Sequence, residues 1–123
     1  MHWIIVDTSS ILFSLSNRKD PFAAITEGFP GGAIMLSKGV LRELEKLASG
    51  SGIHARHARA AIALLTRYDN IKVAEDSSYV DGWILSQAAK LGAKVCTNDV
   101  RLKRRLKGAS VDAFSISKSG MIR

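Results

Sequence analysis

Short apolar runs recur along the chain between longer amphipathic stretches, and this alternation is the strongest constraint on the fold. Runs of four or five residues that include Val and Ile are typical of strands covered on both faces, as in parallel sheets. Strands that alternate with helices predict a three-layer α/β/α sandwich with a mostly parallel five-stranded sheet. The runs that we interpret as strands are residues 3–6, 33–36, 71–74, 93–97 and 110–114.

Helices are expected between these strands. A short one should follow Asp7, and Pro21 should start another, because proline's missing N–H does no harm in a first turn. Ser37 is a good N-cap for a helix that runs to about Ala48, and the helix of residues 79–91 should end at Gly92. Ser77 or Ser78 would cap that last helix, and two more helices are expected over residues 54–67 and 100–107.

The length of 123 residues matches one domain of ordinary size, so we expect a single domain over residues 1–123. The lone cysteine, Cys96, lies in an apolar run, which predicts a buried thiol without a disulfide. No run approaches the roughly 20 apolar residues of a membrane span, and the first run lacks the basic region of a signal peptide. A cytoplasmic protein without membrane contact is therefore expected.

Basic residues outnumber acidic ones, with 18 Lys and Arg against 11 Asp and Glu and a formal net charge of +7. A positive field attracts polyanions such as RNA and speeds their encounter with the protein. Many basic proteins bind no nucleic acid, so the charge only supports an argument that must come from specific residues.

Acidic residues stand where the predicted sheet would place a functional site. In open α/β sheets, sites lie outside the carboxyl ends of the strands. Asp7 directly follows the first predicted strand, and Asp99 follows the fourth, so the two come close together if those strands are neighbours. Asp81 begins a helix, and apolar residues three, four and seven positions later place it on the inward-facing side. A carboxylate in that place costs free energy unless it is paired.

Glu43 lies at the margin of the apolar stripe of its helix, between Val40 and Leu47, from where it could also reach inward. Carboxylates that converge repel one another unless a cation lies among them, and Mg2+ or Mn2+ suits such oxygen ligands. A bound ion of this kind can activate water and stabilise charge on a phosphate. The hypothesis is a metal site built from four acids: Asp7, Glu43, Asp81 and Asp99.

Each acid also has a simpler structural explanation. Asp7 and Asp99 could cap the helices that follow them, Asp81 could favour its helix through the helix dipole, and Glu43 could be solvated. Taken one at a time, these explanations are favoured for every acid except Asp81, because an inward carboxylate needs a partner.

The order of these motifs resembles the PIN-domain nuclease family. The stretch IIVDTSSIL at residues 4–12 is similar to the family's first strand and turn, and VLREL at residues 40–44 to its acid-bearing helix. Residues 80–106, VDGWILSQAAKLGAKVCTNDVRLKRRL, are similar to its second half, where an Asp begins a helix and Thr-x-Asp ends the next strand. The likeness extends from residue 3 to about residue 115.

The resemblance implies a Rossmann-like sandwich and an endoribonuclease that depends on Mg2+ or Mn2+. It carries the metal-binding role to Asp7, Asp81 and Asp99, with Glu43 as the fourth catalytic acid. Supporting positions are Ser9 near the first acid, Thr97, which supports Asp99 two residues later, and Asn98, which stands between Thr97 and Asp99.

Basic residues crowd the segment after Asp99, where they could hold phosphates beside the scissile bond or simply form a solvated helix face. This basic helix most resembles PIN nucleases of small-subunit ribosomal RNA processing, and toxin ribonucleases of toxin–antitoxin pairs share the same acids. The spacing of His54 and His57 is a weak signal for metal binding, and a basic face over residues 54–59 that touches RNA or a partner is the preferred interpretation. Trp83 could stack a base, but it is expected to pack in a core or an interface. The basic residues are Arg101, Lys103, Arg104, Arg105 and Lys107.

The function predicted from the sequence is endonucleolytic hydrolysis of RNA, in ribosomal RNA processing or, alternatively, as a toxin. The implied partners are RNA, a second copy in a homodimer, and a ribosome-assembly protein or an antitoxin. One rival is a PIN-like domain that binds RNA without cutting it. Another is a doubly wound signalling receiver, which is disfavoured because Thr8 and Ser9 follow Asp7 where a receiver places paired acids.

Overall fold

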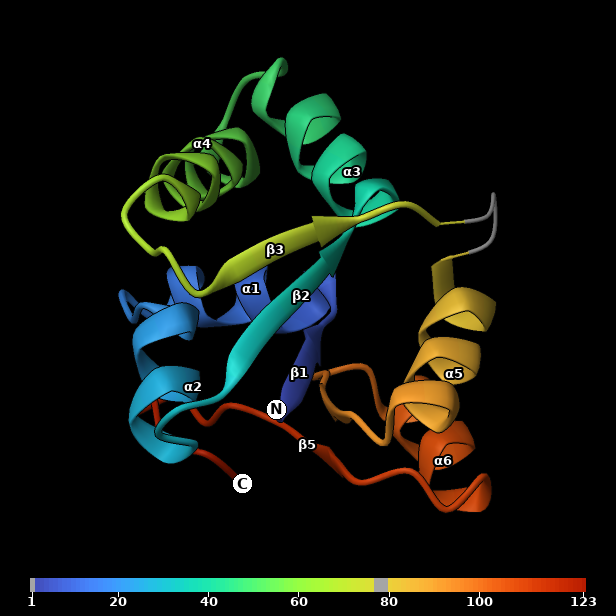
Figure 1. Ribbon diagram of the computed structural model, residues 1–123. Coiled ribbons are helices and arrows are strands. Elements are labelled where there is room, and N and C mark those ends of the chain that lie inside the picture. Colours follow the sequence, from blue (N-terminus) through green and yellow to red (C-terminus); the bar gives the residue numbers. More distant parts are fainter. Residues whose placement is uncertain (1, 77–79) are drawn as a thin grey trace.

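One parallel sheet forms the centre of the computed structural model, which describes residues 2–76 and 80–123 (Figure 1). The strands run in the spatial order β3-β2-β1-β4-β5, and every pair of neighbours is parallel. The expected five-stranded α/β sandwich is confirmed. Its strands are β1 (Trp3–Val6), β2 (Ala33–Ser37), β3 (Ile71–Ala74), β4 (Lys94–Cys96) and β5 (Ala113–Phe114).

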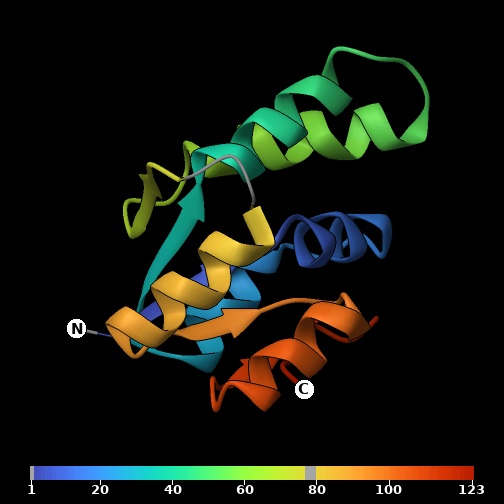
Figure 2. The same ribbon diagram turned by 90° about the vertical axis from the view of Figure 1, so that its right-hand side faces the viewer.

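Helices cover both faces of the sheet. One face carries α1 (Thr8–Ser16), α2 (Pro21–Gly28), α3 (Lys38–Ala48) and α4 (Ile53–Leu65), and the other carries α5 (Val80–Leu91) and α6 (Val100–Gly108). Figure 2 shows α3 and α4 side by side as a helical hairpin beyond the carboxyl end of β2. Within the described ranges, no helix is long and apolar enough to cross a membrane.

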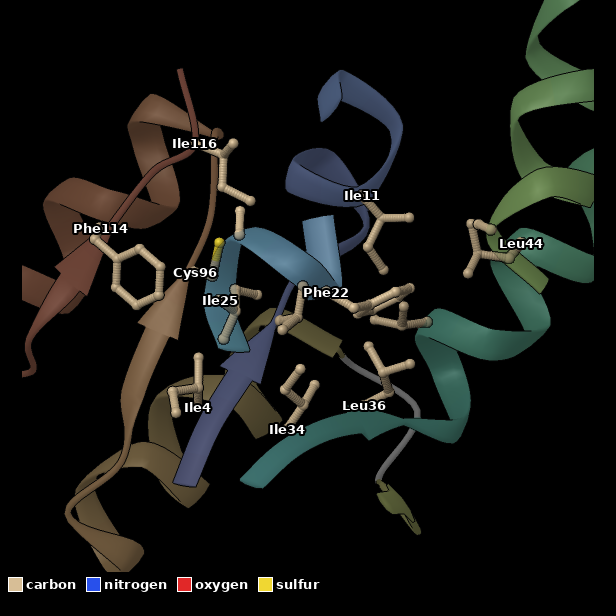
Figure 3. Packing of buried hydrophobic residues seen from close by; sticks show 14 of the residues in the cluster. Ile4, Ile11, Phe22, Ile25, Ile34, Leu36, Leu44, Cys96, Phe114 and Ile116 are labelled. Carbon is tan, nitrogen blue, oxygen red and sulfur yellow. The ribbon is translucent and has the colours of Figure 1, made fainter. Parts of the chain in front are cut away.

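The core has two layers because successive residues of a strand point to opposite faces. Ile4 and Val6 of β1 pack with α1 to α4, whereas Ile5 between them packs with α5 and α6. Figure 3 shows the first layer, in which Phe22 is fully buried among aliphatic side chains. Trp83 is buried in the second layer, as expected for a packing residue. The chain thus uses its short apolar runs on both faces at once.

Burial of the lone cysteine is also confirmed. Cys96 is inaccessible in β4, and this burial raises the pKa of its thiol to about 12. A thiol in such surroundings stays protonated and acts as a small apolar side chain.

The last strand is shorter than the sequence predicts. It comprises only Ala113–Phe114, instead of residues 110–114. The reason lies in the end of α6: Ser110 has a φ of +61°, and the N–H of Val111 donates to the carbonyl of Leu106. Residues 110 and 111 therefore close the helix, and the chain first bonds to β4 at Asp112, whose carbonyl accepts from the N–H of Val95 at 2.9 Å. The proposed caps Ser77 and Ser78, and Tyr79 as the start of α5, lie outside the described residues.

The order of the strands determines where a site can form. From β1 the chain moves outward through β2 and β3, and then returns to the other side of β1 for β4 and β5. The point where the order reverses lies between β1 and β4, and ligands of open α/β sheets bind outside the carboxyl ends of the strands at such a point. The N–H of Asp7 donates to the carbonyl of Cys96 at 2.9 Å, so the segments that follow these two strands start next to each other.

An acid far from this point stabilises the start of α2. Oδ1 of Asp20 accepts from the backbone N–H groups of Phe22 at 2.9 Å and Ala23 at 3.2 Å, and Oδ2 accepts from the hydroxyl of Tyr68. Burial and the bond to Asp20 raise the pKa of Tyr68 to about 12. Asp20 therefore joins a helix N-terminus to the segment that leads into β3.

Replacing Asp20 by Ala should lower the free energy of unfolding by about 1–2 kcal/mol, the range for a lost N-cap. Asp20→Asn should retain most of that stability, because an amide oxygen can still cap the helix. The matched control is Asp112→Ala, because Asp112 is exposed and, among residues 2–76 and 80–123, its carboxylate pairs only with Lys94. That variant should lose less than about 1 kcal/mol. Urea unfolding of the three variants measures the difference, and equal losses for Asp20→Ala and Asp112→Ala would contradict it.

Candidate active site

The four acids singled out from the sequence line one pocket. Its volume is about 810 Å³, and it lies where α1, α3 and α5 begin or pass the carboxyl ends of the strands. The acids come from four separate segments: the end of β1, the middle of α3, the first turn of α5 and the residue before α6. The acids in its lining are Asp7, Glu43, Asp81 and Asp99.

Asp7 is held by hydroxyl groups and does not cap its helix. It occupies the N-cap position of α1, but its side chain accepts no bond from that helix's backbone. Instead, Oδ2 accepts from Ser9 Oγ at 2.7 Å and from Thr97 Oγ1 at 2.9 Å. Over residues 2–76 and 80–123, no group donates to Oδ1, and the residue is only 8% exposed. The carboxylate is thus oriented through one oxygen, and the other is left available.

Thr97 connects two of the acids. Its hydroxyl donates to Asp7 and accepts from the N–H of Asp99 at 3.1 Å. The resemblance assigned Thr97 to Asp99 alone, so its bond to Asp7 is an addition from the structure. Because Thr97 is completely buried, this hydroxyl has a fixed environment.

Asp99 also caps the helix that follows it, which is the simpler role considered for it in the sequence. Its Oδ1 accepts from the N–H groups of Arg101 at 2.9 Å and Leu102 at 3.2 Å, which makes it the N-cap of α6. It also lines the acidic pocket. Capping therefore fixes this carboxylate at the pocket's edge.

The pKa of Asp81 reports both its burial and the charges of the neighbouring acids. Its burial raises its pKa, and the charges of Asp7 and Asp99 raise it further, while Arg105 lowers it. The inward placement expected from the sequence agrees with its half-buried position. Asp7 and Asp99 are therefore close enough to disfavour the charged form of Asp81. Glu43 is exposed and reaches the same pocket from α3.

Asn98 has a structural place beside the pocket rather than within it. Its Oδ1 accepts from Ser10 Oγ at 2.6 Å and from the N–H of Ile116 at 3.2 Å, and its amide donates to the carbonyl of Ile116. These bonds tie α1 and the segment after β5 to the loop that carries Thr97 and Asp99. Asn98 is not part of the pocket lining.

The basic residues after Asp99 separate into two groups. Arg101 and Arg105 line a second cavity of about 240 Å³ together with Asp81 and Asp99. Lys103 instead donates to Ser115 Oγ at 3.3 Å on another side of α6. The remaining two, Arg104 and Lys107, are exposed and belong to neither cavity. Only two of the five basic residues therefore adjoin the acids.

The acidic pocket has a second basic edge, of which the sequence analysis missed Lys46 and did not place His54 beside the acids. Lys46 and His54 are exposed and line the pocket beside Glu43. A signal for Lys46 was present, because it follows Glu43 by three positions and neighbours on a helix surface are three or four residues apart. The place of His54 depends on how α4 folds back along α3, which spacing in the sequence does not reveal.

Asp76 is another residue that the sequence analysis missed. Its side chain is 0% exposed, and Oδ2 accepts from the N–H of Gly39 at 2.9 Å, while Oδ1 pairs with Arg42 at 3.3 Å. Asp76 follows β3, so the rule that selected Asp7 and Asp99 would also have found it. Through these bonds, the segment leading towards α5 and Asp81 is attached to α3, which carries Glu43.

A family model for a PIN-like domain matches residues 4–118, nearly the whole chain. The chain belongs to the PIN-like domain family. Among curated proteins, the ribonuclease VapC9 of Archaeoglobus fulgidus is 34% identical to this PIN-like chain over 104 residues, which cover 84% of the chain and 74% of VapC9. The expectation of family membership drawn from the sequence is confirmed.

Solved structures agree with this assignment. The PIN domain endonuclease Utp24 superposes on the PIN-like chain with a TM-score of 0.77 and 25% identity, over 98% of the chain and 89% of Utp24. VapBC-1 of nontypeable Haemophilus influenzae superposes with a TM-score of 0.61 and 22% identity, over 90% and 96% of the two chains. The second likeness concerns the fold alone.

The donor set of this PIN-like site is compatible with a hydrated divalent cation. Over the described residues, no three acidic, histidine or cysteine side chains are close enough to form a complete metal cage. Mg2+ seldom uses such a cage: it keeps several waters and binds one or two carboxylates together with substrate phosphates. Within the part of the chain that the structure describes, Asp7 offers an oxygen that no protein group donates to. A cation would also relieve the repulsion that, together with burial, raises the pKa of Asp81.

A substitution at Gly39 tests how closely α3 approaches the segment before α5. A Cβ at this position would lie within 3.0 Å of Asp76 Oδ2 and Val80 Cγ2. Gly39→Ala should therefore lower the free energy of unfolding by about 1–3 kcal/mol, the usual cost of overpacking. The matched control is Gly108→Ala in α6, where a Cβ meets nothing within 4 Å and should be neutral or stabilise by up to about 1 kcal/mol. Denaturant unfolding of both variants measures the effect, and equal stability would refute the close approach.

Proposed function

We propose that the protein is a divalent-metal-dependent endoribonuclease. The observation that carries the proposal is the convergence of four carboxylates, from four separate segments, on one pocket at the reversal point of the sheet. Repulsion from Asp7 and Asp99 contributes to the raised pKa of Asp81, and a site with this electrostatic cost is a candidate for function.

The relatives support the class of reaction and substrate. VapC9 is named a ribonuclease and Utp24 an endonuclease, and both match most of this chain. The two branches suggested by the sequence, ribosomal RNA processing and toxin action, would use the same chemistry. The proposal favours the processing branch, because the basic helix α6 directly follows the last acid, and it rests on RNA cleavage in either case.

The residues would divide the work of hydrolysis among them. Asp7, Asp81 and Asp99 would hold Mg2+ or Mn2+, directly or through water, and the ion would supply an activated water and neutralise charge on the phosphate. Ser9 and Thr97 keep Asp7 in one orientation through its Oδ2. Glu43, on the exposed α3 side, would orient the attacking water. Attack forms a P–O bond to that water and breaks the bond to the leaving ribose oxygen, which takes up a proton.

The arginine-lined cavity would hold a phosphate next to the scissile one. Arg101 and Arg105 share this cavity with Asp81 and Asp99, so a phosphate bound there would lie next to these two acids. Guanidinium groups bind phosphate through paired N–H donors, which gives orientation as well as affinity.

Neutralising the acids should abolish cleavage and preserve the fold. With a labelled, partly single-stranded RNA and Mn2+ or Mg2+, Asp7→Asn combined with Asp99→Asn should reduce the cleavage rate at least about 100-fold, in the range for loss of a preorganised charge. Asparagine can still accept the bonds that Asp7 and Asp99 receive, so circular dichroism should be unchanged. Chelation by EDTA should stop the wild type, and added Mn2+ should restore it.

The outcomes separate the alternatives. Equal cleavage by the wild type and the double variant would place the activity in another site or in a contaminant. RNA binding without cleavage, with either ion, would favour the non-catalytic RNA-binding PIN domain.

Two neighbouring arginines provide a matched test of the phosphate cavity. Arg105→Gln should weaken RNA binding and reduce the magnitude of the slope of log K against log salt by about 0.7, the value for one lost contact to a single strand. Arg104→Gln changes the same charge on the same helix but outside the cavity, and should leave the slope nearly unchanged. Fluorescence anisotropy between 50 and 200 mM KCl measures both. Equal effects would mean that α6 attracts RNA only through its net charge.

A further inference from the structure

The acidic pocket extends beyond the acids along α3. Glu43, Lys46 and Leu47 line it from one face of α3, at spacings of three and four residues, and Gly50 lines it beyond the end of the helix at Ala48. At 1.5 Å of rise per residue, the helical part of this edge, from Glu43 to Leu47, is about 6 Å long. Ser51 and His54 complete it where α4 folds back. The pocket, called the groove below, therefore has a basic edge of Lys46 and His54 next to Glu43, in addition to the other acids.

The groove has the lining that a nucleotide requires. Besides the polar groups, Leu12, Leu47, Ala55 and Val80 contribute apolar surface, against which a base or ribose can pack. Its volume of about 810 Å³ lies in the usual range for small-molecule sites. Lys46 is exposed and, over residues 2–76 and 80–123, forms no ion pair. Its ammonium is therefore available to a phosphate.

The acids lie between two basic ends. On one side the groove leads to Lys46 and His54, and on the other the smaller cavity leads to Arg101 and Arg105. Asp81 and Asp99 line both, so the two hollows adjoin at the acids. A polyanion drawn to both basic ends would place an internal phosphate over the carboxylates, whereas a strand end bound at one side would leave the other empty.

We infer that Lys46 and His54 form a second phosphate-binding subsite, opposite the arginine cavity, so that a single RNA strand crosses the acids and is held on both sides of the scissile bond. This inference rests on the proposed endoribonuclease function and adds the path of the substrate to it. Lys46 binds a backbone phosphate by charge, and the imidazole of His54 hydrogen-bonds to the same nucleotide.

The test measures binding separately from cleavage. In an Asp7→Asn background, a fluorescein-labelled 12-nucleotide oligouridine is titrated by anisotropy between 50 and 200 mM KCl. Lys46→Gln should weaken binding and reduce the magnitude of the salt slope by about 0.7. The matched control is Lys90→Gln, because Lys90 is also an exposed lysine in the last turn of a helix, α5, but lies outside both cavities. It should leave the slope nearly unchanged.

A second measurement locates the strand. Oligouridine substituted with 4-thiouridine, crosslinked by light and digested, should label peptides from residues 43–55 and from residues 99–106 in the same sample. Label confined to the α6 peptide, or equal slopes for Lys46→Gln and Lys90→Gln, would overturn the inference while wild-type cleavage still upheld the proposed function. Absent cleavage with the Lys46 effect intact would overturn the proposed function and leave the subsite as a property of an RNA-binding domain.

Discussion

The pairing of β1 with β4 is the constraint on which the rest of the site depends. The two strands are remote in sequence but adjacent in the sheet, with Val6 opposite Cys96. The bond from the N–H of Asp7 to the carbonyl of Cys96 continues this register beyond the strands. Thr97 then reaches the carboxylate of Asp7, and its oxygen receives the N–H of Asp99. A slip of one residue would turn these side chains to the opposite face and separate them.

The sequence predicted most of the fold because its signals are local. A buried parallel strand has to be apolar on both sides, and each apolar run therefore stands out against the amphipathic helices. The end of the chain was less predictable, because Ser110 and Val111 close α6 before β5 begins. Both residues suit a strand in isolation, so tertiary context decides their conformation.

The candidate site was predictable where it follows strand ends and less so where it depends on how helices pack. Asp7 and Asp99 could be placed together once β1 and β4 were taken as neighbours. Asp81 could be placed on the inward side of its helix because apolar residues follow it three, four and seven positions later. The separate directions of Arg105 and Lys103 follow from the contacts of α6 with α5 and with the segment after β5, which composition does not encode. Asp76 had a clear signal at the end of β3, but an acid bonded to a helix start and an acid in an active site look alike in a sequence.

The order of the strands means that the candidate site is completed late during synthesis of the chain. The acids of the candidate site are spread along the sequence, from Asp7 near its start to Asp99 directly before the last helix. During synthesis the chain emerges from its amino end, and domains fold as units once enough of their sequence is available. Until β4 inserts beside β1, Asp7 lacks Thr97 and the pocket lacks Asp99 and Arg105. The unfinished chain therefore carries only part of the acidic pocket, and the candidate site is complete only after β4 and the start of α6 have joined the sheet.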